Sequence, residues 1–97
     1  MLEIIETPQE ANLLFEEFAG KDLEVLKRIE KQFNISSESV WYAFFEATKS
    51  GRVDIMKWLY KTYKIPKNRI MLTRAGNIAY KNNQREALLW LHKTFCT

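Results

Sequence analysis

The residues that could perform chemistry in this chain are few and do not group into a site. His92 and Cys96 lie four positions apart, so on a helix both would face the same way. A structural zinc site needs four ligands, and neither a Cys-x-x-Cys motif nor a second histidine is present to complete one. The pair therefore predicts an exposed histidine beside a fraying helix end, with no metal bound.

A catalytic centre is equally hard to assemble. His92 is the one histidine, and no Gly-x-Ser-x-Gly or comparable nucleophile turn accompanies it. Glu16 and Glu17 are adjacent carboxylates, but neighbours on a helix point about 100° apart, so both are expected in solvent. Three scattered glycines do not make a phosphate-binding loop. We therefore expect a protein that is not an enzyme and holds no cofactor.

The two halves of the chain carry opposite charge. Residues 1–47 contain ten acids and four bases, a net charge of −6, whereas residues 48–97 contain eleven bases and two acids, a net charge of +9. Such asymmetry points to partners. The basic half could bind nucleic-acid phosphates with steep salt dependence, although no homeodomain, zinc finger or other reading motif is present. An acidic protein partner and head-to-tail association of oppositely charged halves remain equally open.

An internal repeat predicts the elements that position these residues. Residues 85–95 match residues 53–63 at a shift of 32 positions, and residues 23–33 match less closely at a shift of 30. The first of these matches aligns Trp58 with Trp90. A repeat of about 20–50 residues is typical of solenoids, in which small units stack and offer a surface for binding.

Helix signals divide the chain into six helices, arranged as three antiparallel pairs. Thr7 and Glu10 form a capping-box pattern, Asp22 and Asn68 suit helix N-caps, and Gly51 is a natural stop. These signals define units of about 7–35, 36–66 and 67–97 within one domain, 1–97. The expected helices run from Pro8 to a stop at Gly20, over about 23–33, from a cap at Ser36 or Ser37 to about Ser50, from Val53 to an end set by Ile65-Pro66 at about Lys64, from Arg69 to Lys81, and over about 85–95.

Small residues recur on the first helix of each later unit. Ala43 aligns with Ala75, and Ala47 aligns with Ala79, at the same shift of 32 positions. Two small residues four apart on one face let a neighbouring helix approach closely. We therefore expect these alanines to be packing positions.

The sequence resembles ankyrin repeats. Residues 51–59 read Gly-Arg-Val-Asp-Ile-Met-Lys-Trp-Leu, close to the family's second-helix pattern Gly-x-Leu/Val-Glu/Asp-Val/Ile-Val-Lys-x-Leu. Residues 20–29 follow it with one extra residue, and Ala43 and Ala47 fall near the family's alanines. The Lys-Trp-Leu-Tyr ending is similar to divergent ankyrin-type repeats of large DNA viruses. The resemblance implies a protein-binding scaffold without a cofactor.

The chain departs from the ankyrin pattern at its loops. The Thr-Pro-Leu-His tetrapeptide is absent, and residues 34–37 and 64–67 replace the Gly-Ala-Asp loop. These segments lack the turn residues of a projecting β-hairpin, so we expect short connections.

The aligned tryptophans allow two interpretations. Arg28 takes the place of Trp58 and Trp90 in the first unit, which a core position would rarely accept, so we expect partial exposure. An exposed tryptophan can anchor a partner. Alternatively, each indole covers the seam between neighbouring units. If a protein binds, the candidate contact residues are Trp58, Trp90, Lys57, Lys61, Arg74 and Arg85.

These observations predict an all-α, ankyrin-like solenoid of three helix pairs that acts as a protein–protein interaction module, and the resemblance implies a viral protein that interacts with a host. The alternatives are a nucleic-acid-binding protein that uses residues 48–97 and an oligomer-forming structural protein. No apolar run approaches the roughly 20 residues of a membrane helix. The acidic start and the lone Cys96 predict a cytoplasmic location, in the host if viral. Apolar residues near the ends are expected to be capped by a partner or a second copy: Leu2, Ile4, Ile5, Leu88 and Phe95.

Overall fold

The computed structural model describes residues 7–95, and within that range it contains helices and no strand. The all-helical class and the six helices predicted from the sequence are confirmed. The helices are α1 (Pro8–Phe18), α2 (Leu23–Gln32), α3 (Ser37–Lys49), α4 (Val53–Tyr63), α5 (Arg69–Lys81) and α6 (Arg85–Phe95).

Side-chain caps begin four of these helices as the sequence predicted. The Thr7 hydroxyl accepts from the Glu10 amide at 3.1 Å, and the Thr7 amide donates to the Glu10 carboxylate at 3.1 Å. Asp22, Ser36 and Asn68 accept an amide N–H at the start of α2, α3 and α5. Each cap satisfies a donor that the helix itself leaves without a partner.

The turns after α3 and α5 share one geometry. Gly51 and Asn83 have positive φ angles of 70° and 56°. The amide that follows Gly51 donates to the carbonyl of Ala47 at 2.9 Å, and the amide that follows Asn83 donates to the carbonyl of Ala79 at 2.8 Å. These bonds are typical of a Schellman helix end, for which glycine and asparagine are the favoured residues.

Two helix ends differ from the sequence-based expectation. Helix α1 ends at Phe18, and Gly20 does not take a positive φ. Glycine fits there for another reason, since a Cβ would lie 2.5 Å from the Ser50 hydroxyl. Helix α4 ends because Lys64 turns left-handed at φ 50°, two residues before Pro66.

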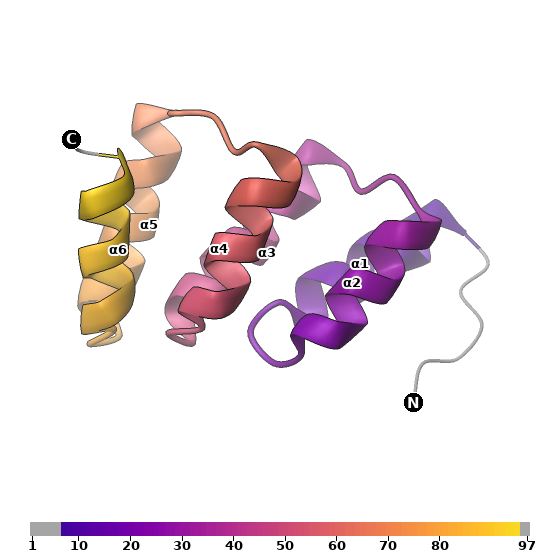
Figure 1. Cartoon of the computed structure of the whole chain (residues 1–97), viewed down its shortest axis with the longest axis horizontal. Helices are drawn as coiled ribbons and strands as arrows, with labels where there is room; N and C mark the ends of the chain where they lie inside the picture. Colours follow the sequence, from indigo (N-terminus) through magenta and orange to yellow (C-terminus); the bar gives the residue numbers. More distant parts are fainter. Residues whose placement is uncertain (1–6, 96–97) are drawn as a thin grey trace.

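The six helices form two layers of three (Figure 1). Helices α1, α3 and α5 lie side by side in one layer, with α3 packed against both neighbours. Helices α2, α4 and α6 form the other layer, and each packs on the helix that precedes it in the chain. We call α1/α2, α3/α4 and α5/α6 the first, second and third pairs. The pairs follow one another along the longest axis of a body of 40 × 23 × 17 Å, with the first and third pairs at opposite ends.

Small side chains on the first-layer helices are buried, as expected of packing positions. Larger side chains, led by Phe15 and Phe44, fill the space between the layers and are fully buried. Close helix approach requires small residues at the contact, because any larger side chain would separate the backbones. The alanines of this layer all have zero exposed surface: Ala11, Ala43, Ala47, Ala75 and Ala79.

Candidate functional site

The two aligned tryptophans occupy equivalent seams between helix pairs. Trp58 on α4 packs against Phe15 on α1, and Trp90 on α6 packs against Phe44 on α3, each with ring centroids 6.2 Å apart. Both indoles are partly buried against the core, as expected. Each tryptophan therefore packs against the first helix of the preceding pair. The observed packing is the one that the seam interpretation describes.

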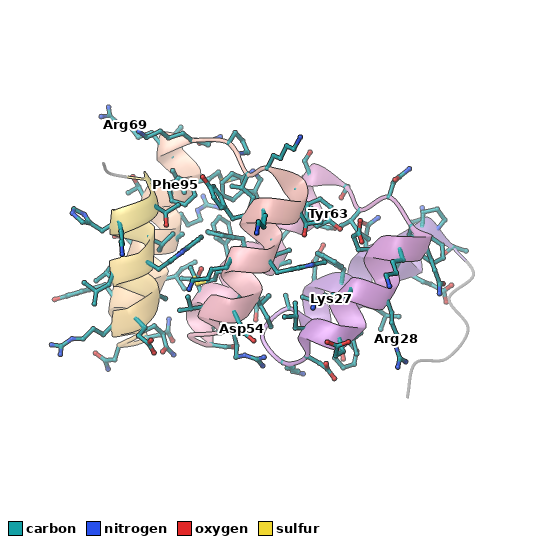
Figure 2. The ribbon with its side chains drawn as sticks, in the orientation of Figure 1. Lys27, Arg28, Asp54, Tyr63, Arg69 and Phe95 are labelled. Atoms are coloured by element: carbon teal, nitrogen blue, oxygen red, sulfur yellow. The ribbon has the colours of Figure 1, made fainter. Side chains whose placement is uncertain are left out.

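A second aromatic position accompanies each tryptophan. Tyr63 lies 6.0 Å from Trp58, and Phe95 lies 6.0 Å from Trp90, ring to ring. Figure 2 labels Tyr63 and Phe95 near the C-terminal ends of α4 and α6. Phe95 also meets Tyr60 at 5.2 Å and is only 7% exposed. The expectation that Phe95 needs an external cap is therefore wrong, because the second pair already covers it.

The other apolar residues expected at the ends differ in their outcome. Leu88 is 36% exposed in the third pair. Leu2, Ile4 and Ile5 lie outside the described residues.

Side-chain hydrogen bonds to backbone carbonyls join the turns of successive pairs. Arg52 Nη1 donates to the carbonyl of Lys21 at 2.8 Å, and Gln84 Nε2 donates to the carbonyl of Lys49 at 2.9 Å. Arg52 and Gln84 are separated by the repeat distance of 32 residues. Arg52 also pairs with Asp54, and its two hydrogen bonds lower the pKa of that carboxyl below the usual value. These turns are structural joints, and sequence reasoning did not identify them.

The adjacent carboxylates Glu16 and Glu17 do not form an acid–base pair. Glu16 accepts a hydrogen bond of 2.6 Å from the hydroxyl of the buried Ser39, across the seam between the first and second pairs. Beside it, Asn12 accepts from the amide of Ser36 at 3.0 Å. Glu17 is exposed. The expectation that both carboxylates lie free in solvent is therefore wrong for Glu16, which helps to join the two pairs.

The candidate basic residues are exposed but do not converge on one place. Lys57 and Lys61 lie one turn apart on α4, in the second layer. Arg74 lies on α5, with its guanidinium 5.9 Å from the ring centre of Phe45. Arg85 begins α6. The four basic candidates are thus spread over three helices and both layers. Trp58 and Trp90, in contrast, pack at the seams between helix pairs.

A groove between α5 and α6 has a volume of about 490 Å³. Its floor is apolar, formed by Leu72, Leu88 and Leu91 around Gly76. A Cβ added at Gly76 would meet nothing within 4 Å. We call this hollow the α5–α6 groove.

Basic side chains border the α5–α6 groove. Lys67, Arg69 and His92 line it and are exposed, and no carboxylate is among its lining residues. Figure 2 shows Arg69 extending from the end of α5, at the end of the molecule farthest from α2. Apolar floors with charged borders are common in protein-binding grooves. Sequence reasoning named Leu88 and His92 separately but did not bring them together.

Within residues 7–95, no three His, Cys, Asp or Glu side chains lie close enough together to hold a metal ion. His92 is exposed, and Cys96 lies outside the described range. Over the same stretch, no helix is both long enough and apolar enough to cross a membrane.

Comparison with models of protein families finds no match to this chain. Searches of curated proteins and of solved structures likewise find no match. The geometry and charge of the chain itself are therefore the basis for assigning a function.

Proposed function

We propose that this chain is a non-enzymatic protein-binding module with an ankyrin-like solenoid arrangement, and that the α5–α6 groove receives the partner. The observation that carries the proposal is the uncovered apolar side of the third pair. Exposed apolar surface bordered by polar residues is typical of a protein interaction site. The basic border favours an acidic partner, since complementary charge speeds encounter and selects among partners.

Comparison with the second pair supports this use of the groove. Met56 in the second pair is fully buried, whereas Leu88, 32 residues later, is 36% exposed. Likewise, Phe44 is fully buried, whereas the corresponding position in the third pair is Gly76, which is partly exposed. The third pair covers this surface of the second pair, and within the described residues nothing covers the equivalent surface of the third.

Repeated contacts support the solenoid arrangement. The tryptophan seams and the turn-to-turn hydrogen bonds recur at the spacing of the sequence repeat. In a solenoid each unit contacts only its neighbours, and the stacked surface serves for binding. The resemblance to viral ankyrin-type repeats favours a host protein as the partner, and the lone Cys96 suits a reducing compartment such as the host cytoplasm.

Site-specific photo-crosslinking in cells tests the proposal. A photoreactive phenylalanine analogue at Leu88 is expected to yield an adduct with a partner protein. The matched control carries the analogue at Tyr80, which is 77% exposed but does not line the groove. The Leu88 adduct is expected to disappear in a Gly76→Phe background, because the added ring fills the groove. Absence of a protein adduct from Leu88 in every host extract would refute the groove as a binding site.

Nucleic-acid binding is the second candidate, and the charge of the second half favours it. Ten of the eleven bases of residues 48–97 are exposed, and only Arg52 has an ion-pair partner within the described residues. Fluorescence anisotropy with labelled DNA and RNA at rising salt tests this candidate. Binding whose affinity falls steeply with salt, and weakens in a Lys57→Gln/Lys61→Gln variant, would support it. Binding with no salt dependence, or none at 50 mM salt, would exclude it.

A further inference from the structure

We infer that the α5–α6 groove binds an acidic amphipathic helix that inserts a tryptophan side chain over Gly76. This inference rests on the proposed protein-binding function and names the chemistry of the partner. The molecule itself contains two examples of an indole that covers the equivalent surface of a helix pair. In each, a helix of the following pair delivers an indole to the surface of the pair before it.

The equivalence comes from the repeat distance. Trp90 contacts Phe44 at 6.2 Å and Tyr60 at 5.8 Å, ring to ring, on the second pair. Moving these two receiving residues forward by 32 positions gives Gly76 and His92. Both line the α5–α6 groove. The groove is therefore the third-pair counterpart of the surface that holds Trp90.

Gly76 makes this counterpart deeper than the earlier surfaces. Phe15 and Phe44 fill the first and second pairs at the tryptophan contact, whereas Gly76 contributes no side chain there. The groove volume of about 490 Å³ lies within the range of small-molecule sites and accommodates an indole. Tryptophan buries more apolar area than any other side chain and is enriched at the centres of interfaces.

The shape of the groove favours a helix as the carrier. Leu72 on α5 and both Leu88 and Leu91 on α6 form an apolar surface between two helices. At the seam between the second and third pairs, the equivalent surface is covered by α5 and α6. An amphipathic helix packs its apolar face into such a groove and keeps its polar face in water.

The charge around the groove favours an acidic carrier, and the residue at the tryptophan position of the first pair disfavours a second copy of this chain. Lys67 and Arg69 line the groove and have no ion-pair partner among the described residues. A copy that stacked its own first pair here would offer Arg28, which stands where the later pairs carry tryptophan. At that place Arg28 would face Gly76 and His92 and would supply no indole to fill the space over Gly76. Figure 2 shows Arg28 on α2, far from Arg69.

Nuclear magnetic resonance titration of the isotope-labelled full chain tests the inference. The probe is a synthetic Glu-rich amphipathic peptide of about four helical turns, with one tryptophan as its only aromatic residue. The matched peptide carries alanine instead. We expect the tryptophan peptide to shift the amide signals of Gly76, Leu72 and Leu91, with an affinity that falls as salt is raised. The alanine peptide is expected to bind at least about tenfold more weakly.

Variants of the protein locate the site. Gly76→Phe fills the groove and is expected to weaken the tryptophan peptide at least about tenfold, whereas Gly76→Ala leaves the groove open and changes affinity less than about twofold. Lys67→Glu/Arg69→Glu reverses the border charge and is also expected to weaken binding at least about tenfold. Lys57→Glu/Lys61→Glu makes the same charge change outside the groove and serves as its control. Circular dichroism checks that each variant keeps its helices.

The outcomes separate this inference from the proposed function. Equal affinity of the two peptides at Gly76 would overturn the role of tryptophan and leave protein binding intact. If both peptides still shift the amide signals of Gly76→Phe, or if the shifts are confined to other helices, the groove assignment for this partner would be overturned. Self-association in sedimentation that Gly76→Phe abolishes would identify a second copy as the occupant and overturn the inference. Failure of both peptides, with a crosslinked partner still found at Leu88, would refute this partner chemistry alone.

Discussion

Trp90 lies on Phe44 with ring centroids 6.2 Å apart, and this contact joins the third helix pair to the second. Trp58 and Phe15 make the same contact at the same separation one seam earlier. The sequence repeat thus corresponds to a repeated packing contact. The stability of the molecule is expected to depend on these seams, because each pair alone buries only part of its apolar surface.

Replacing a seam tryptophan is expected to destabilise the fold. Trp90→Ala should lower the free energy of unfolding by about 3 kcal/mol, since removal of a large packed side chain leaves a cavity. Trp58→Ala should have a similar effect. Urea denaturation measures both, with Tyr80→Ala as a control at a 77% exposed position expected to change stability by less than about 0.5 kcal/mol. A Trp90→Ala variant as stable as the parent would contradict the seam interpretation.

Gly76→Ala is expected to stabilise the protein by about 1 kcal/mol. Alanine favours the helix interior over glycine by that amount, and a Cβ at Gly76 meets no other atom within 4 Å. Gly20→Ala is the matched comparison and is expected to destabilise, because its Cβ would lie 2.5 Å from the Ser50 hydroxyl and 3.1 Å from the backbone carbonyl oxygen of Glu46, which cannot rotate away. Thermal unfolding distinguishes the two variants. A lower melting temperature for Gly76→Ala would mean that the open space at this position is filled.

Tyr63→Phe is expected to raise stability by about 1 kcal/mol, because the buried Tyr63 hydroxyl has no hydrogen-bond partner among the described residues. Phe33 and Phe95, at the corresponding repeat positions, show that phenylalanine fits there. Burial, and then the charge of Glu30, raise the pKa of Tyr63 well above its ordinary value. Because the folded pKa lies above the unfolded pKa, stability should fall as pH rises through and beyond about 10.

Alkaline denaturation checks the tyrosine prediction. The parent protein should lose stability above about pH 10 more steeply than Tyr63→Phe does. Equal pH dependence of the two proteins would show that Tyr63 ionises without unfolding.

Gln84→Glu is expected to weaken the joint between the second and third turns. Gln84 Nε2 donates to the carbonyl of Lys49 at 2.9 Å, and an ionised carboxylate of the same shape cannot donate that bond. The expected loss is about 1 kcal/mol at neutral pH. Lowering the pH until the carboxyl is protonated should restore part of the loss relative to the parent. Denaturant titration at both pH values measures this, and a Gln84→Glu variant that is unaffected at neutral pH would show that the bond contributes nothing.

The helices could be predicted from the sequence because their signals are local. The Thr7–Glu10 capping box and the cap at Asn68 lie next to the helices they begin. The reason for Gly20 could not be predicted, because it depends on Ser50 in another helix pair. The choice between seam and partner anchor for Trp58 likewise required its contact with Phe15.

The groove was harder to predict than the helices. Gly76 in the sequence indicated only a weakened helix. Its alignment with Phe44 becomes informative because Phe44 packs against Trp90 in the structure. The exposure of Lys67 and Arg69 agrees with the basic second half, but their position beside an apolar floor required the fold.

The side-chain hydrogen bonds between pairs have a direction. In each, the later pair donates and the earlier pair accepts: Ser36 to Asn12, Ser39 to Glu16, Arg52 to Lys21 and Gln84 to Lys49. A ribosome releases the chain in that same order, so the acceptor of each of these bonds is synthesised before its donor. None of these bonds therefore has to wait for a partner that is still to be translated.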